Sequence, residues 1–265
     1  MTTPLDPGFG LFEPEPEPEP EPVPGPEAGP SEPPRRPRRV LFVAFIALGA
    51  VLIAGGAATL YREMTRAATP AEATAALQQE IATRWERIPA GKIFPATVSY
   101  VDPQGDTMTA RLVGIAPPAS CSVALEAESN ADLRGLGCST ILRATYVDAS
   151  GALAATVGVA VLRSPSSAVK ASNIGTLGPG SGLHAVPFAG TITGQFGDAA
   201  RGMQGAAAGG PYLFLYTAGF TDGLPGTAAA GQQGELTSFG SGVDTVLQAV
   251  LTGHGKPCNM KDITC

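Results

Sequence analysis

The sequence predicts an α+β protein: a sheet of about five to seven strands with helices packed on it, preceded by one transmembrane helix and a disordered tail rich in proline and glutamate. Three patterns support this fold class. Residues 1–39 hold 13 of the 25 prolines, residues 40–60 contain no charged side chain, and the remaining chain interleaves segments of strand and helix periodicity. The predicted parts are the tail 1–39, the span 40–60, a helical juxtamembrane linker 61–92 and a domain 93–265.

The tail cannot form a core. Glutamate and proline alternate over residues 13–22, and no basic residue precedes Arg35. Proline lacks a backbone donor, the carboxylates repel one another, and too few apolar side chains are present to offset the entropy lost on ordering. The composition is typical of a solvated spacer, and a docking arm for a basic or proline-binding partner is the alternative.

The net charge of −6 lies mostly in this tail, which has eight acidic residues and four arginines. The rest of the chain is therefore nearly neutral. Because no domain-sized excess of lysine and arginine is available to neutralise phosphates, the composition excludes a basic nucleic-acid-binding protein.

Residues 40–60 form the predicted transmembrane helix. At 1.5 Å per residue their 21 positions span roughly 30 Å, the thickness of the hydrocarbon core of a bilayer. A soluble core helix rarely lacks a polar face over this length, and the late start and the length of the run argue against a cleaved signal peptide. Four arginines precede the span, whereas Arg62 and Arg66 follow it. The positive-inside rule therefore places the N-terminus in the cytoplasm and residues 61–265 outside the cell.

Cysteine usage agrees with this topology. An even number of cysteines lies on the predicted outer side, where disulfides form: Cys121, Cys138, Cys258 and Cys265. Three pairings are possible, and we favour the local ones, Cys121 with Cys138 and Cys258 with Cys265. Zinc is the rival use of four cysteines, but the sequence contains no Cys-x-x-Cys motif, and we predict no metal site.

The pairing of Cys121 with Cys138 sets a geometric condition. One unbroken helix over residues 122–134 would be roughly 20 Å long, and the chain could not then return to the separation of about 5–6 Å that a disulfide needs. Ser129, with Asp132 three residues on, offers an N-cap at which a second short helix begins after a turn.

Local patterns give the first elements of the outer part. Thr69-Pro70-Ala71-Glu72 is a capping box that begins a helix. Segments 94–100 and 108–112 alternate apolar and polar residues on either side of a turn, which predicts a hairpin that Pro117-Pro118 ends.

A second pair of strands follows at 140–147 and 152–162. The latter is apolar on both faces, which is typical of the centre of a sheet. Ser164-Pro165 then opens a helix that runs to about residue 172.

Glycine becomes dense from residue 175 onward. The elements predicted there are, in order, a strand over 186–193, a weak helix over 198–207, an apolar strand over 212–220 and a long loop over 221–239. Ser241 and Asp244 form a second capping box, which begins a helix that Gly253 ends. We expect the helices to cover one face of the sheet.

Candidate catalytic residues are few. The side chains available for a His-centred triad are two histidines, two serines and two aspartates: His184, His254, Ser181, Ser172, Asp198 and Asp222. No Gly-x-Ser-x-Gly motif surrounds a serine, and the glycine-rich loop 178–182 lacks the Gly-Lys-Ser/Thr ending of a phosphate-binding loop. We therefore predict no catalytic residue, no cofactor and structural roles for both histidines.

One segment suggests a recognition surface. The strand 212–220 and the turn after it group aromatic and polar side chains of kinds that favour interfaces: Tyr212, Tyr216, Phe220 and Asp222. A buried core strand is the alternative interpretation.

Arginine outnumbers lysine and alanine is abundant, as in proteins of high-GC bacteria. Segments 93–98, 142–148, 156–161 and 211–219 resemble those of actinobacterial single-pass membrane proteins of unknown function, and the resemblance covers most of residues 70–253. It implies an extracytoplasmic α+β domain and supplies no catalytic residues. More distantly, a strand followed by Ser-Pro and an alanine-rich helix is similar to the extracytoplasmic sensor domains of actinobacterial kinases.

These observations favour a non-enzymatic, membrane-anchored envelope protein whose domain binds a protein or wall component outside the cell, while the acidic tail contacts a partner inside. Two alternatives stay open. One is an extracytoplasmic sensor that signals through oligomerisation of the membrane helix, and the other is a hydrolase that uses His184. A serine and an aspartate within hydrogen-bond reach of an exposed His184 would favour the hydrolase.

Overall fold

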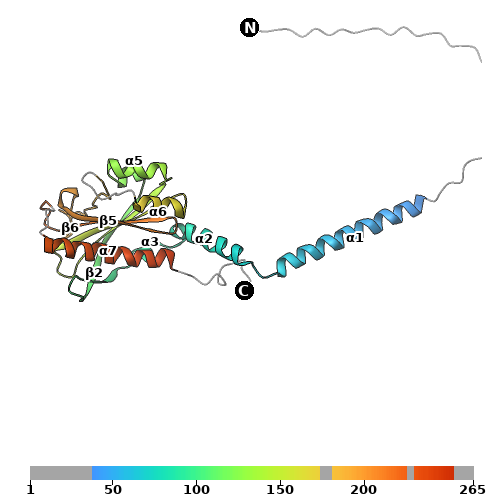
Figure 1. The fold of residues 1–265 in the computed structure, drawn as a ribbon, viewed down its shortest axis with the longest axis horizontal. Helices are drawn as coiled ribbons and strands as arrows, with labels where there is room; N and C mark the ends of the chain where they lie inside the picture. Colours follow the sequence, from blue (N-terminus) through green and yellow to red (C-terminus); the bar gives the residue numbers. More distant parts are fainter. Residues whose placement is uncertain (1–37, 174–180, 226–229, 254–265) are drawn as a thin grey trace, which may run out of the picture. The chain divides into compact units, whose positions relative to one another are not determined.

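The computed structural model describes residues 38–173, 181–225 and 230–253 (Figure 1). The chain divides into two compact units, Met1–Met64 and Thr65–Cys265. Most of the predicted tail lies outside the described residues, as do His254 and the predicted pair of Cys258 and Cys265.

Helix α1 (Arg38–Thr65) contains the predicted span. Its stretch Leu41–Thr65 has a mean hydropathy of 2.4 and is not buried, so by length and composition this helix could cross a membrane. The Thr59 hydroxyl donates a hydrogen bond of 2.9 Å to the carbonyl oxygen of Gly56, which satisfies this polar group within the helix. Residues 40–60 of this helix contain no charged side chain, so this stretch is apolar around its circumference, as a lipid-facing segment requires.

The second unit is built on one antiparallel sheet of six strands, in the order β1-β2-β3-β4-β6-β5. The strands are β1 (Thr97–Val101), β2 (Thr107–Ala119), β3 (Thr140–Val147), β4 (Leu153–Val161), β5 (Arg201–Gly209) and β6 (Tyr212–Phe220). The α+β class and the predicted number of strands are therefore confirmed. The central position predicted for β4 is also confirmed, because this strand pairs with β3 on one side and β6 on the other.

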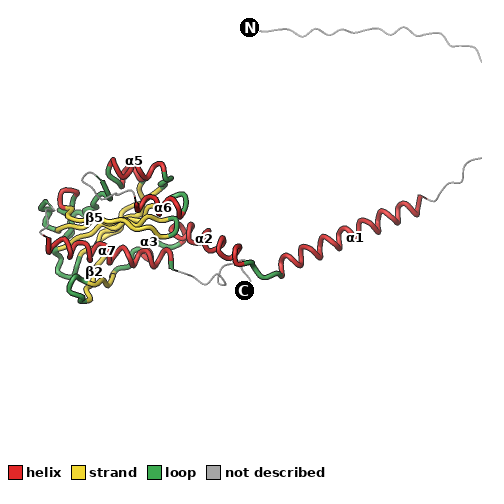
Figure 2. Tube along the Cα trace, viewed as in Figure 1, coloured by secondary structure: helices red, strands yellow, loops and turns green. Residues whose placement is uncertain are grey.

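Helices cover both faces of this sheet (Figure 2). They are α2 (Pro70–Arg87), α3 (Ala90–Ile93), α4 (Cys121–Ala124), α5 (Ala127–Gly135), α6 (Pro165–Asn173), the 3-10 helix η1 (Asp198–Ala200) and α7 (Ala230–Thr252). Helix α7 contacts both edge strands, β1 and β5, so the sheet curls around it. We call the side that holds α2, α3 and α7 the concave face, and the side that holds α4, α5 and α6 the convex face.

The expectation of helices over one face is therefore wrong. Strand β6 shows why, because its side chains are buried on both sides: Tyr212 and Phe214 pack in the concave core, whereas Leu213 and Leu215 pack in the convex core. A strand that is apolar on both faces needs cover on both faces.

Helix α7 begins at Ala230, not at Ser241, so the predicted loop over 221–239 is wrong for its second half. The Ser241 hydroxyl donates to the Thr237 carbonyl within the helix and does not act as an N-cap. The glycines that suggested a loop let the helix approach the sheet. A Cβ atom on Gly240 would lie 2.2 Å from Cδ2 of Tyr216, closer than any side chain allows.

Two further predictions are wrong in the glycine-rich half. Residues 198–207 form η1 and most of β5 in place of a weak helix. Gly205 of β5 pairs with Tyr216, and a Cβ atom there would lie 2.2 Å from the tyrosine ring, so the pairing depends on a missing side chain. Residues 186–193 form irregular chain followed by turns in place of a strand, and the Thr156 hydroxyl accepts a hydrogen bond from the Val186 backbone at 2.9 Å.

Strand β2 is longer than predicted, because it continues through Pro117 and Pro118. These prolines lie beyond the residues that pair with β1 and in an irregular stretch of pairing with β3, between Ala116 and Ala119. A strand tolerates proline where no ladder hydrogen bond is lost.

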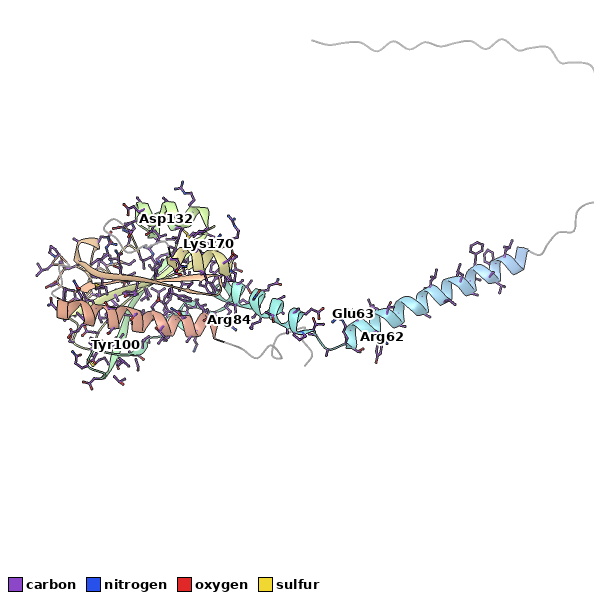
Figure 3. All side chains as sticks on the ribbon, viewed as in Figure 1. Arg62, Glu63, Arg84, Tyr100, Asp132 and Lys170 are labelled. Carbon is purple, nitrogen blue, oxygen red and sulfur yellow. A yellow bond between two sulfur atoms is a disulfide. The ribbon has the colours of Figure 1, made fainter. Side chains whose placement is uncertain are left out.

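Helix α2 packs on the concave core, although it lies in the segment predicted as a linker. Its capping box is confirmed, with the Thr69 backbone donating to Glu72 at 2.8 Å. At its other end Arg84 (Figure 3) donates to the carbonyl oxygens of Leu251 and Gly253 at 3.1 and 2.6 Å. Arg84 thereby satisfies carbonyl groups at the C-terminal end of α7 and ties α2 to the domain.

Candidate functional site

The convex face carries the disulfide predicted between Cys121 and Cys138, whose Cα atoms are 6.2 Å apart. The chain between them turns, as that pairing requires, but the turn is earlier than predicted. Glu126 occupies the N-cap position of α5, and Ser129 is buried inside the helix, where its hydroxyl accepts a hydrogen bond of 2.7 Å from the Gly182 backbone. Ser129 thus holds the segment after α6 against α5 and does not begin the helix.

That segment runs beside the residues that lead into α5 and contacts them through an isolated β-bridge. Leu125 and Leu183 form an antiparallel bridge, and the His184 backbone donates to the Ala124 carbonyl at 2.9 Å. Because these bonds fix the backbone on both sides, the side chains of Glu126 and His184 are brought together. Neither spacing nor periodicity indicates this contact, since the two residues are far apart in the sequence.

Four side chains meet here, and we call them the polar cluster: Glu126, His184, Asp198 and Arg201. Nδ1 of His184 lies 2.7 Å from Oδ2 of Asp198, and the Ala185 backbone donates to Oδ1 of Asp198 at 2.8 Å. The imidazole is therefore oriented by a carboxylate that is itself held by the backbone.

Arg201, the first residue of β5, binds the other acid of the cluster. Its Nη2 contacts Oε1 of Glu126, its Nη1 donates to the Leu183 carbonyl at 3.2 Å and its Nε to the Asp198 carbonyl at 3.1 Å. The side chains of Arg201 and Glu126 are 15% and 14% exposed, so water screens this ion pair less than one on the surface. Oε2 of Glu126 is buried without a hydrogen-bond partner among the described residues.

The polar cluster contains two of the residues considered for a His-centred catalytic triad, His184 and Asp198. Of the two candidate aspartates, the structure brings Asp198 to His184, whereas Asp222 lies in the turn after β6 and accepts a hydrogen bond from Leu224. Ser172 donates to the Val169 carbonyl within α6. In the part of the chain that the structure describes, Asp198 is the hydrogen-bond partner of the His184 ring, and no serine hydroxyl reaches it. Among the described residues, the arrangement is a histidine–aspartate pair with no serine hydroxyl hydrogen-bonded to the histidine.

The proposed recognition strand lies largely in the core. Tyr212 is fully buried and donates its hydroxyl hydrogen to the Ile81 carbonyl of α2, and Tyr216 is 7% exposed against α7. Burial raises the pKa of Tyr212 to about 12. The interpretation as a buried core strand therefore describes both tyrosines, while Phe220 is half-buried and Asp222 is exposed.

Two exposed apolar side chains lie in the loops beside Phe220 and Asp222, and sequence reasoning missed both. Leu224 is 63% exposed and Ile192 is 52% exposed. The two loops touch, because a Cβ atom on Gly223 would lie 2.8 Å from the Gln195 carbonyl oxygen. We call the four side chains Ile192, Phe220, Asp222 and Leu224 the loop-end surface.

Asp244 of α7 is a buried acid on the concave face, with 3% of its surface exposed. Burial raises the pKa of its carboxyl from 3.8 to about 7, and the weak contact of 3.5 Å with Gln248 opposes this only slightly. Its Oδ1 atom has no hydrogen-bond partner among the described residues. The sequence interpretation of Asp244 as a helix-capping acid is wrong, because the helix begins well before it.

Comparisons of the chain with protein-family models, with curated proteins and with solved structures found no match. The resemblance to actinobacterial single-pass membrane proteins therefore stays a prediction.

Proposed function

We propose that the protein is a non-enzymatic binding or scaffolding module of the cell envelope, anchored by α1, with its globular domain outside the cell. The observation that carries this proposal is the Cys121–Cys138 disulfide in the unit that follows an apolar helix of membrane-spanning length. Disulfides persist in oxidising compartments and are rare in the cytosol. The arginines that precede the span support the same orientation.

Binding is favoured over catalysis because the two acids of the polar cluster are already held by other protein groups. Asp198 is held by His184 and the Ala185 backbone, and Glu126 is held by Arg201. A hydrolase needs a nucleophile activated by the histidine, and no serine among the described residues hydrogen-bonds to His184. The contacts of the cluster join three segments of the convex face, which is a structural role.

The loop-end surface is the proposed place of binding. Strand β6 carries Tyr212 against α2 at one end and Phe220 at the other, roughly 26 Å away at about 3.3 Å per residue. The loop-end surface therefore lies at the opposite end of β6 from the contact with α2. Exposed apolar side chains beside an acid fit a protein partner with an apolar patch and a basic residue.

The orientation is tested by labelling intact cells that produce the full chain with a membrane-impermeant maleimide. A cysteine introduced by Gln104→Cys, in the exposed turn between β1 and β2, is expected to react, and one introduced by Ser31→Cys in the tail is expected to react only after permeabilisation. Both variants carry serine in place of Cys258 and Cys265, so that the maleimide does not label these two native cysteines. Labelling of position 31 in intact cells, with position 104 labelled only after permeabilisation, would contradict the proposed topology.

Binding is tested by placing a photo-crosslinking amino acid at Ile192 or at Leu224 in the same cells. We expect one envelope protein to be captured from both positions, and Leu224→Asp to abolish capture from position 192. The matched control is Val169 of α6, an apolar side chain of similar exposure on another part of the domain. Identical products from position 169, or no product from either loop, would contradict the proposal.

A further inference from the structure

We infer that the polar cluster is a binding site for a zinc ion, with Glu126, His184 and Asp198 as its three protein ligands. One candidate ligand atom from each of these side chains lies within 4.8 Å of the others. The inference does not depend on binding at the loop-end surface, because none of these three side chains belongs to that surface.

The separations suit a small divalent ion after modest side-chain movement. Zinc binds nitrogen and oxygen ligands at about 2.0–2.2 Å, so two ligands of a tetrahedral ion lie roughly 3.3 Å apart. Nδ1 of His184 and Oδ2 of Asp198 are 2.7 Å apart and would separate slightly, whereas the widest separation would shrink by about 1.5 Å. When the ion binds Nδ1, the ring proton resides on Nε2, so neutral imidazole is kept.

Each carboxylate has one oxygen that Arg201 or the backbone does not hold. Arg201 binds Oε1 of Glu126, and Oε2 is buried without a hydrogen-bond partner among the described residues. The Ala185 backbone binds Oδ1 of Asp198, which leaves Oδ2 toward His184. A buried carboxylate oxygen without a partner is costly, and a cation would remove that cost. Donors that hold the remaining oxygens are what orients carboxylate ligands in metal sites.

The donor set favours zinc over calcium and magnesium. Imidazole with two carboxylates suits zinc, whereas calcium and magnesium favour sites made of oxygen alone. Arg201 brings one positive charge against two negative ones, so the cluster keeps a net negative charge while His184 is neutral. The side chains of His184 and Asp198 are 34% and 43% exposed, which gives the ion a route from solvent.

Zinc binding is tested on the full chain purified in detergent and stripped of metal with a chelator. Equilibrium dialysis against zinc chloride, with the metal measured by mass spectrometry, is expected to give one ion per chain. Because an ion that binds only the folded state stabilises it, thermal unfolding should shift upward with zinc. A tenfold excess of magnesium or calcium should leave the bound zinc unchanged.

The ligand variants are Glu126→Gln, His184→Gln and Asp198→Asn, each expected to weaken zinc binding at least tenfold. Glu128→Gln is the matched control, because it removes an exposed acid on the same helix, and it should bind as the unaltered chain does. His254→Gln should also bind normally. Equal loss from Glu128→Gln would show diffuse binding to surface acids and would overturn the site.

Folding of the variants is checked without metal, by their thermal unfolding in chelator. If a ligand variant does not fold, the unaltered chain still decides the question through cobalt. Co²⁺ at a tetrahedral site of this kind gives strong visible absorption, which zinc should abolish in a one-to-one titration. No stoichiometric zinc and no such absorption would mean that the cluster is an ion-pair network alone.

Discussion

The two faces of the sheet are stabilised in different ways. The concave face is covered mainly by one long helix, α7, and its core is built from large side chains such as Tyr146, Phe214 and Phe239. The convex face is covered by three short helices over smaller side chains, and it carries the disulfide and the polar cluster. Where a face buries less apolar surface, covalent and ionic links hold its segments together.

The largest effect should come from the buried acid of the concave face. Asp244 holds its proton in the folded state up to about pH 7, whereas the unfolded chain loses it near pH 3.8. Between these values the unfolded state binds fewer protons, so the free energy of unfolding falls as pH rises through this window. At 1.36 kcal/mol per pKa unit the total loss is up to about 4 kcal/mol.

Asp244→Asn has no proton to lose, so it should flatten this part of the pH profile and unfold at a higher denaturant concentration than the unaltered chain at pH 8. Asp222→Asn, which changes an exposed acid, is the control and should follow the original profile. Parallel profiles for Asp244→Asn and the unaltered chain would mean that the acid is not buried in the folded state.

The next largest effect should come from the covalent link of the convex face. Replacing both Cys121 and Cys138 by serine opens a loop of 17 residues and should lower the free energy of unfolding by about 3 kcal/mol. Denaturant unfolding of the full chain in detergent measures this loss, and reduction of the unaltered chain should reproduce it. A loss well below 1 kcal/mol would show that the short helices hold the convex face without the disulfide.

The smallest of the three effects tests the close approach of α7 to the sheet. Gly240→Ala places a methyl group against Tyr216 and should cost about 2 kcal/mol, although alanine favours a helix. Gly234→Ala in the same helix meets only Pro103 at 3.6 Å and should stabilise the domain by up to about 1 kcal/mol. Thermal unfolding of both variants checks the difference in sign, and equal stabilisation by both would contradict the packing of α7.

The elements predicted correctly from the sequence are those whose defining pattern lies within a single segment. Strands β3, β4 and β6 each have a run of apolar or β-branched side chains, and the capping box of α2 is complete within four residues. Prediction failed for α7 and β5, because their glycine and alanine content indicates weak or irregular structure when the chain is taken alone. Gly240 of α7 and Gly205 of β5 both lie against the ring of Tyr216 in β6, where a larger side chain would not fit.

The candidate site shows the same division. The sequence named His184 and Asp198 as available side chains but left two aspartates and two serines open, and it did not connect either residue with Glu126 or Arg201. The contact arises from the bridge between Leu125 and Leu183, which brings together two segments that share no local pattern. The sequence allows strand 212–220 to be a recognition surface or a buried core strand. The burial of Tyr212 against α2 and of Tyr216 against α7 favours the core strand.

The sequence by itself determined the apolar helix, the α+β class and the strands with the strongest apolar runs, and it favoured the pairing of Cys121 with Cys138 among three possibilities. These follow from composition and periodicity, which express the hydrophobic demands of each segment. The tertiary structure decided that both faces of the sheet are covered, that a glycine-rich segment is a long helix and that Glu126, His184, Asp198 and Arg201 meet. Those outcomes depend on steric fit and hydrogen bonds between residues far apart in the chain, and no single segment contains that information.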